Sequence, residues 1–326
     1  LRVMACRSRS DSSTGYMMRS LDALIFMTWV FLSLIRNRPS KIYVATNPPI
    51  AVPFIVFLYC RVFRAHYYYH AQDIHPEAAN VVVPLHPWLF KLLQLPDIRT
   101  MRHAEALITL SEAMKESIRA RSGTRAPIWL VENPALAISE DQAKKDRSIV
   151  FCGNAGRLQR IPMLIEAIST YLDQGGTLTF SFVGAGIHAQ AIESLAEQYD
   201  AVHYYGVLDA LGAAKIVAMH QWALLPIEDE VTRYAFPSKA SSYILSGCGI
   251  IAICSRLTSV GGWIEKNKLG IVCNPTVEDI VNCLRSIDND VIDKSSFTNN
   301  NHLKSRLSID YHLAAINEIL GFASKQ

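Results

Sequence analysis

Two glycine-rich turns follow apolar, strand-like segments in the second half of the chain. They lie at 153–156 (GNAG) and 184–186 (GAG), and Arg157 and Arg160 stand beside the first. Glycine lets backbone amides approach an anion closely, and arginine adds positive charge. The turns therefore predict a site for a phosphate-bearing ligand. The chain has no GxGxxG turn with a following acidic residue, which argues against NAD, and no GxxxxGK[ST] loop, which excludes a P-loop nucleotide triphosphatase.

The histidines and cysteines do not predict a metal site or a disulfide framework. His66 and His70 are four residues apart in a strand-like run, which places them about 13 Å apart along the strand. The seven cysteines include no CxxC pair. An odd number of scattered cysteines favours a protein of a reducing compartment.

These residues need a scaffold of alternating strands and helices. Short apolar runs end in turn residues and are separated by amphipathic stretches, including two expected helices at 84–95 and 97–103. The expected strands are at 41–46, 66–69, 106–110, 128–131, 149–152, 178–183, 202–205, 222–225, 250–254 and 270–273. This alternation predicts parallel sheets covered on both faces, with ligands bound beyond the carboxyl ends of the strands.

The chain length suits two domains. A chain of 326 residues corresponds to two units of about 150 residues. The polar stretch 138–147 is the predicted linker. We therefore expect an α/β fold with two doubly wound Rossmann-like domains, the first at 1–140 and the second at 148–306.

The N-terminal part is both basic and apolar. Residues 1–64 hold nine Lys and Arg against two acidic residues, and the apolar stretches 23–35 and 50–63 are each followed by arginine. Both stretches are shorter than the ~20 residues that span a bilayer. They are interpreted either as buried core helices or as helices that dip into lipid headgroups. Basic residues that flank apolar stretches favour an anionic membrane surface over nucleic acid as the partner.

Ten segments, in order along nearly the whole chain, resemble the GT-B-fold glycosyltransferases of family 4 from bacterial surface-polysaccharide clusters. They include YYHAQDIHPEAA (68–79), FCGNAGRLQRIPMLIEAI (151–168), FSFVGAGIHAQAIESLA (180–196) and FPSKASSYILSGCGIIA (236–252). The sharpest signals are the PSK tripeptide at 237–239, followed by Tyr243 and Gly247, and the QD-x-x-PE run from Gln72 to Glu77.

The resemblance implies a transferase of the hexosyl type with a retaining outcome, acting in lipopolysaccharide, O-antigen, capsule or exopolysaccharide synthesis. The donor is a nucleotide-diphospho-sugar, which is a substrate, so no separate cofactor is expected. The acceptor is a polyprenyl-diphosphate-linked saccharide held by the first domain, to which the closing helix within 307–326 returns. The enzyme is expected to lie in the cytoplasm, peripherally attached to the inner membrane.

The resemblance also implies roles for particular residues. Gln72 and Asp73 stand at the catalytic position, where Asp73 orients the acceptor hydroxyl or accepts its proton; the alternative is a helix cap. Lys239 is a second cation near the diphosphate, or simply a lysine at a helix start. Glu230 contacts sugar hydroxyls, or belongs to a solvated acidic turn. The full expected donor site is Gly153, Asn154, Gly156, Arg157, Gly184, Gly186, Glu230, Ser238, Lys239 and Ser242.

The chain departs from the family pattern at three places. The paired glutamates fall by register at Tyr234 and Ser242, and Gln159 stands where a lysine is common. The opening strand and glycine-rich loop are not found, so the resemblance implies that the first domain lacks one β-α-β unit and that this chain catalyses poorly. Two alternatives stay open: a catalytically impaired binding partner of a transferase, and a GT-B-fold nucleotide-sugar epimerase.

Overall fold

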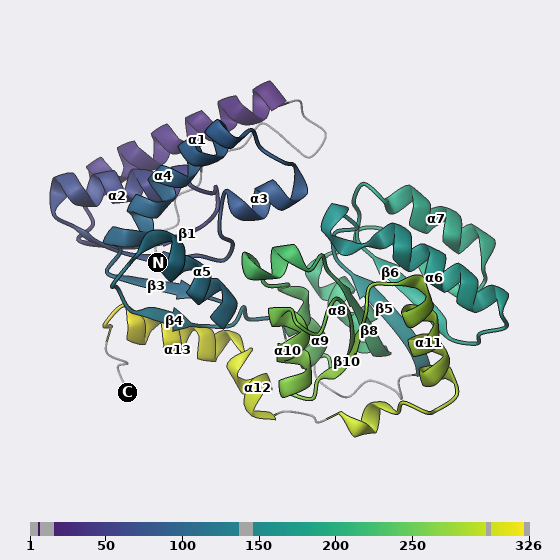
Figure 1. The fold of residues 1–326 in the computed structure, drawn as a ribbon. Coiled ribbons are helices and arrows are strands. Elements are labelled where there is room, and N and C mark those ends of the chain that lie inside the picture. The colour runs from purple at the N-terminus through teal and green to yellow at the C-terminus, as the bar shows by residue number, and fades with distance from the viewer. Residues whose placement is uncertain (1–5, 7–15, 137–145, 298–300, 323–326) are drawn as a thin grey trace. The chain divides into compact units, whose positions relative to one another are not determined.

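The structure is a computed structural model that describes residues 6, 16–136, 146–297 and 301–322 (Figure 1). The chain divides into two compact units, Leu1–Val131 and Glu132–Gln326. The first unit ends directly after strand β4 (Ile128–Leu130), the last strand of the first sheet, and the domain bounds at 1–140 and 148–306 stay a prediction. Most of the predicted linker lies outside the described residues, and its last two residues begin strand β5.

The first unit contains a four-stranded parallel sheet in the order β1-β2-β3-β4. Its other strands are β1 (Lys41–Ala45), β2 (His66–His70) and β3 (Ala106–Thr109). All of β3 and four of the five residues of β2 are buried, as expected for parallel strands with both faces covered. The four strands predicted for this half of the chain are confirmed.

Among the described residues, five helices accompany this sheet: α1 (Tyr16–Asn37), α2 (Ala51–Phe63), α3 (Glu77–Val82), α4 (Pro87–His103) and α5 (Glu112–Ser122). Helix α2 packs against both α1 and α4 (Figure 1). The hydroxyl of Ser111 accepts a hydrogen bond from the Met114 amide at 3.3 Å and so caps α5, as its position predicts.

The prediction of two separate helices at 84–95 and 97–103 is wrong. Helix α4 continues through Pro96, although proline removes one helical hydrogen bond. The segment after Pro96 buries Asp97, Thr100 and Met101 completely, so tertiary packing overrides the local preference. In the described part of the chain, no helix combines the length and the hydropathy needed to cross a membrane.

The second unit contains a six-stranded parallel sheet in the order β10-β9-β8-β5-β6-β7. Its strands are β5 (Asp146–Cys152), β6 (Thr179–Val183), β7 (Val202–Tyr204), β8 (His220–Pro226), β9 (Gly249–Ile253) and β10 (Gly270–Cys273). Large side chains such as Phe151, Phe180 and Trp222 form its buried core. All six strands were predicted.

The described part of this unit has eight helices: α6 (Ile161–Asp173), α7 (Ala189–Gln198), α8 (Ala210–Ala218), α9 (Lys239–Leu245), α10 (Ser259–Lys266), α11 (Val277–Asp288), α12 (Asn301–Arg306) and α13 (Ile309–Ile319). Short 3₁₀ turns lie at η1 (Arg157–Gln159) and η2 (Glu230–Arg233). The expected return of the closing helix to the first domain stays a prediction.

Candidate functional site

The second sheet reverses its strand order between β5 and β8. From β5 the chain adds β6 and β7 on one side, then returns to the other side of β5 with β8, β9 and β10. In open parallel sheets a crevice for ligands forms at such a reversal, beyond the carboxyl ends of the strands. The expected donor-side residues all follow β5, β6 or β8, so the structure gathers them at this edge of the second unit.

The two glycine turns pack directly on each other. The amides of Gly153 and Ala155 donate to the carbonyl oxygens of Val183 and Ala185, both at 2.8 Å. The Gly156 amide donates to Oε1 of Gln159 at 3.0 Å. Three of the amides expected to cradle a phosphate are therefore already engaged within the protein. An anion bound here would therefore be recognised mainly by side chains.

Lys239 places a buried amine at this crevice. Its Nζ atom is shielded from solvent, lies 4.2 Å from the centroid of the Phe151 ring and has no hydrogen-bond partner among the described residues. A Cβ atom placed on Gly153 would lie 3.2 Å from Nζ, so this glycine leaves room for the amine. Burial lowers the pKa of Lys239 to about 8, and Cys152 opposes this effect. An unpaired buried cation is costly, and a bound anion would offset that cost.

Tyr243 fixes the helix that carries Lys239. Its hydroxyl accepts a hydrogen bond from the Cys152 amide at 2.9 Å and donates to the Cys152 carbonyl at 3.2 Å. Pairing of β5 with β8 runs only as far as Val150, so the hydroxyl satisfies backbone groups that β8 does not reach. The sequence pattern alone predicted no role for Tyr243, although this residue stands one helical turn after Lys239.

Replacing Tyr243 with phenylalanine is expected to lower the free energy of unfolding by about 1–3 kcal/mol, because two buried backbone groups lose their partner. Urea denaturation measures this change. Tyr199→Phe is the matched control, since that hydroxyl bonds Asp173 at the surface. A loss no larger than that of the control would show that the Tyr243 bridge contributes nothing.

Arg160 ties the first glycine turn to the loop after β8. Its Nε donates to the Ile227 carbonyl at 2.9 Å, and its Nη2 lies 2.9 Å from Oε2 of Glu228 and 3.0 Å from Oδ1 of Asp229. Arg160 is therefore occupied, and Arg157 is the arginine left for an anion. Arg157 is exposed and has no ion-pair partner within the described residues.

The other donor-side candidates vary in exposure. Asn154, Glu230 and Ser238 are exposed, and Ser242 is half-buried in the first turn of α9. The Ser238 hydroxyl does not cap this helix. These side chains are accessible from the same edge of the sheet as Lys239, whereas Glu228 and Asp229 are held by Arg160.

Gln72 and Asp73 lie in the first unit, directly after β2. The Gln72 amide donates to Oγ1 of Thr46 at 2.9 Å. Burial raises the pKa of the half-buried Asp73 carboxyl, and nearby His75 partly offsets this. Burial lowers the pKa of His75, and nearby Asp73 raises it and so partly offsets this effect. A carboxylate and an imidazole thus lie two residues apart in the loop after β2, and both groups are chemically able to accept a proton from a hydroxyl.

Comparison with known proteins gives the class of fold. No family model matches the chain. A probable glycosyltransferase, WbjE from Pseudomonas aeruginosa, is 26% identical over 186 residues, which cover 54% of this chain and 46% of WbjE. The match therefore spans about half the length of this relative.

Solved structures match nearly the whole chain. HepE from Anabaena, solved in complex with UDP, has a TM-score of 0.67 at 15% identity, covering 93% of this chain and 84% of HepE. Sucrose-phosphate synthase from Thermosynechococcus elongatus has a TM-score of 0.69 at 13% identity, covering 96% and 81%. The lipopolysaccharide outer core galactosyltransferase WaaB, in its apo form, has a TM-score of 0.59 at 13% identity, covering 98% and 84%. The predicted α/β fold with two Rossmann-like domains is confirmed, and it is the fold of GT-B glycosyltransferases.

Proposed function

We propose that this chain is a glycosyltransferase whose second unit binds a nucleotide-diphospho-sugar at the β5/β8 reversal. The observation that carries the proposal is the buried amine of Lys239 beside Gly153, which has no hydrogen-bond partner in the part of the chain that the structure describes. The similarity to WbjE and the UDP complex of a protein with the same fold support it. As the diphosphate leaves, negative charge develops on it, and Lys239 and Arg157 stabilise that charge.

The proposed acceptor and the proposed biosynthetic process rest on the resemblance to family 4. We propose transfer with retention to a polyprenyl-diphosphate-linked saccharide in surface-polysaccharide synthesis, with Asp73 facing the acceptor hydroxyl. The resemblance to WaaB, named as a lipopolysaccharide galactosyltransferase, supports this setting. Tyr234 and Ser242 at the positions of the paired glutamates favour the second candidate, a binding partner that has lost turnover.

Calorimetry with UDP, GDP and ADP and their sugar conjugates tests the donor site. Each charge-assisted contact contributes about 1.5–3 kcal/mol, so Arg157→Ala and Lys239→Met should each weaken binding by roughly tenfold to a hundredfold. In the wild type, affinity should fall roughly fourfold between pH 7 and pH 8.5, because the amine with its pKa of about 8 loses its charge over this range. Lys239→Met should abolish this pH dependence.

Lys215→Met, at an exposed lysine of α8, is the control and should leave affinity unchanged. If Arg157→Ala or Lys239→Met also leaves affinity unchanged, that residue does not belong to the site. If no nucleotide binds to the wild type, the donor-site proposal fails.

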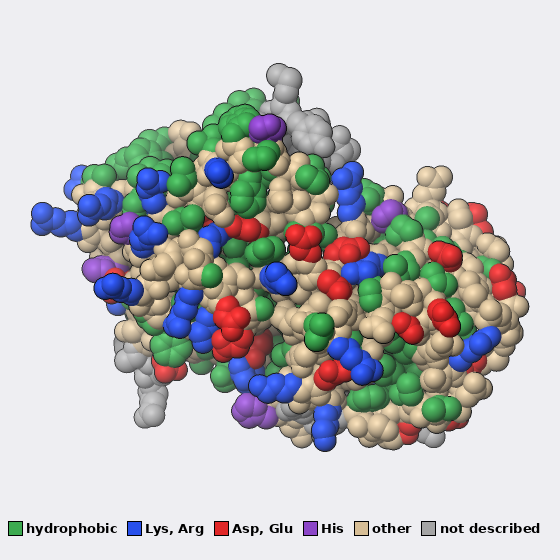
Figure 2. Space-filling model, in the orientation of Figure 1, with side chains coloured by type: hydrophobic (Ala, Val, Ile, Leu, Met, Phe, Trp, Pro, Cys, Tyr) green, Lys and Arg blue, Asp and Glu red, His purple; other side chains and the backbone are tan. Residues whose placement is uncertain are grey.

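We also propose that the first unit attaches peripherally to the cytoplasmic face of the inner membrane. On α1, the apolar side chains of one face are exposed: Leu21, Leu24, Ile25, Phe31 and Leu32. Figure 2 shows hydrophobic side chains gathered at the top of the view, where α1 runs. Exposed arginines follow at the ends of α1 and α2, namely Arg36, Arg38, Arg61 and Arg64. An apolar face bordered by cations matches an anionic lipid surface.

Vesicle sedimentation tests this attachment. We expect binding to vesicles that contain phosphatidylglycerol, weak binding to phosphatidylcholine alone, and release by high salt or alkaline carbonate, since each basic residue contributes about 1 kcal/mol. Leu24→Ser should reduce binding, whereas Leu211→Ser at an exposed position of α8 should not. Binding that is indifferent to lipid charge would refute the proposal. Extraction by detergent alone would indicate a membrane span instead.

A further inference from the structure

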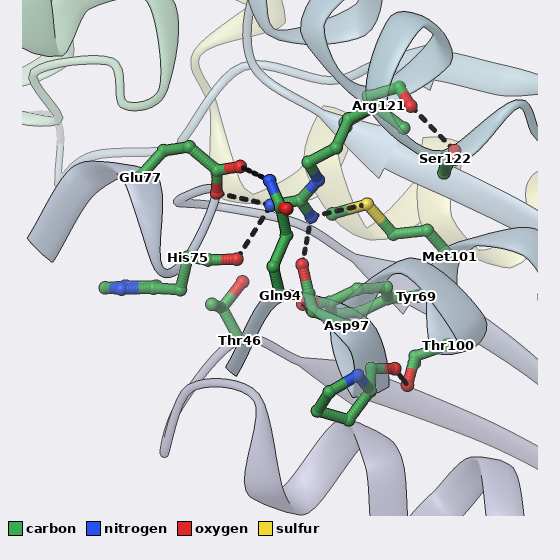
Figure 3. Close-up of polar contacts among 12 residues, drawn as sticks. Thr46, Tyr69, His75, Glu77, Gln94, Asp97, Thr100, Met101, Arg121 and Ser122 are labelled. Atoms are coloured by element: carbon green, nitrogen blue, oxygen red, sulfur yellow. Dashed lines mark hydrogen bonds and ion pairs between the residues drawn. The ribbon is translucent and has the colours of Figure 1, made fainter. Parts of the chain in front are cut away.

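A buried ion cluster lies beside the loop that joins β2 to α3 (Figure 3). This loop carries Asp73 and His75. The centre of the cluster is Arg121 at the end of α5, whose side chain is 9% exposed. Nη1 of Arg121 donates to the His75 carbonyl oxygen at 2.8 Å and to the Glu77 carboxylate. Nη2 donates to the Asp97 carboxylate. One guanidinium thus binds the loop itself and the helices α3 and α4.

The cluster also reaches the strand that leads into the loop. Oδ1 of Asp97 accepts a hydrogen bond from the Tyr69 hydroxyl of β2 at 3.1 Å. Oε1 of Glu77 accepts another from Nε2 of Gln94 at 2.8 Å. The residues before the loop and the residues after it are therefore attached, directly or through one carboxylate, to the same guanidinium.

Stability alone gives a weak reason for such a cluster. The free-energy cost of desolvating one guanidinium and two carboxylates can equal or exceed the free energy gained from their attraction. Well-packed apolar residues often stabilise a core equally well. What the cluster provides that apolar residues do not is a directed bond to one backbone carbonyl, that of His75. This bond holds the backbone of the loop at His75, two residues after Asp73.

We propose that Arg121 is a positioning residue that fixes, through its bond to the His75 carbonyl, the loop that carries Asp73 and His75, a carboxylate and an imidazole at the carboxyl end of β2, here called the pair. The role of this pair toward an acceptor hydroxyl rests on the proposed function. The placement of the pair does not rest on the proposed function, so it can be tested separately.

The test is NMR titration of the His75 ring in the full chain, with His75→Gln assigning the signal. Burial, the largest effect, and Arg121 lower the pKa of His75, whereas Asp73 and Glu77 raise it. We expect a midpoint below 6.5 in the wild type, and a further decrease in Asp73→Asn. Arg121→Lys keeps the charge but loses the forked geometry. In Arg121→Lys the midpoint should rise toward 6.5 as the loop opens to solvent, and its response to Asp73→Asn should shrink or vanish.

Two further variants separate positioning from simple destabilisation. Ile118→Val, at a buried residue one turn earlier on α5, should lower stability but leave both midpoints in place. Asp97→Asn weakens the contact between α4 and the Arg121 guanidinium and should raise the His75 midpoint by a smaller amount than Arg121→Lys. It keeps the test decisive if Arg121→Lys does not fold. An unchanged midpoint and an unchanged response to Asp73→Asn would overturn the proposal.

Steady-state kinetics test the catalytic role of the pair independently of the titration. Arg121→Lys should lower kcat by about tenfold or more with little change in the donor KM, because the donor residues lie in the second unit. If the wild type turns over no donor, the proposed function fails while the titration still decides the positioning role. If kcat is unaltered although the His75 midpoint shifts, Arg121 positions the pair but the pair takes no part in catalysis.

Discussion

Arg121→Met is expected to lower the free energy of unfolding by about 3–5 kcal/mol, the usual cost of breaking a buried ion pair. The substitution leaves the carboxylates of Glu77 and Asp97, whose side chains are 10% and 1% exposed, without their cation. The pKa of Asp97 is already raised by burial despite Arg121, and without Arg121 it should rise further. A carboxylate with a raised native pKa favours folding less as pH increases, so the deficit should be larger at pH 7 than at pH 5.

Urea denaturation at both pH values measures this loss. Arg119→Met, the same change at an exposed residue of the same helix, should alter stability by no more than about 0.5 kcal/mol. Combining Arg121→Met with Glu77→Gln and Asp97→Asn should recover part of the loss, because no charge is then left unpaired. Equal losses in Arg121→Met and Arg119→Met would show that the buried cluster does not depend on its cation.

The second large effect is expected for Gly184→Ala, with a loss of about 3 kcal/mol or more. Gly184 has a φ of 127°, which alanine adopts only with strain. A Cβ atom there would lie 2.1 Å from the carbonyl oxygen of Gly153, so one backbone segment must move away. Because Gly153 lies against Lys239, nucleotide affinity should fall together with stability.

Gly262→Ala in α10 is the matched control. Nothing lies within 4 Å of a Cβ placed on Gly262, and its φ is not in the left-handed region. The same substitution should therefore be neutral or stabilise the protein by about 0.5–1 kcal/mol. Denaturation and calorimetry on both variants test the contact between the two glycine turns. An unchanged Gly184→Ala variant would contradict the close approach of these turns.

Local sequence signals predicted the strands and the glycine turns well. Apolar runs such as 250–254 and 270–273 end in turn residues, and these properties depend only on neighbouring residues. The helix through Pro96 was not predictable in this way, because burial of Asp97 and Met101 against distant segments decides it. Local preference is a weak guide where packing opposes it.

Contacts between residues far apart in the sequence also decide which groups of the candidate site are available. Arg157 and Arg160 differ by three positions and look equivalent in sequence, yet only Arg160 meets the acidic turn 69 residues away at Asp229. The Tyr243 hydroxyl and the Cys152 backbone are 91 positions apart. The glycines at 153 and 156 were identified, but their amides proved to be engaged. Only the tertiary fold determines which donors and cations stay available.

We propose above that this chain transfers a sugar from a nucleotide-diphospho-sugar bound at Lys239. The most direct measurement incubates the protein with a panel of such donors and a polyprenyl-diphosphate-linked saccharide, and follows nucleoside diphosphate release and acceptor mass. We expect one donor to extend the acceptor by a single sugar with matching diphosphate release, and Lys239→Met to lower this rate. Nucleotide binding without release from any donor would contradict the claim and identify a binding partner, and conversion of the nucleotide-sugar to its epimer would identify an epimerase.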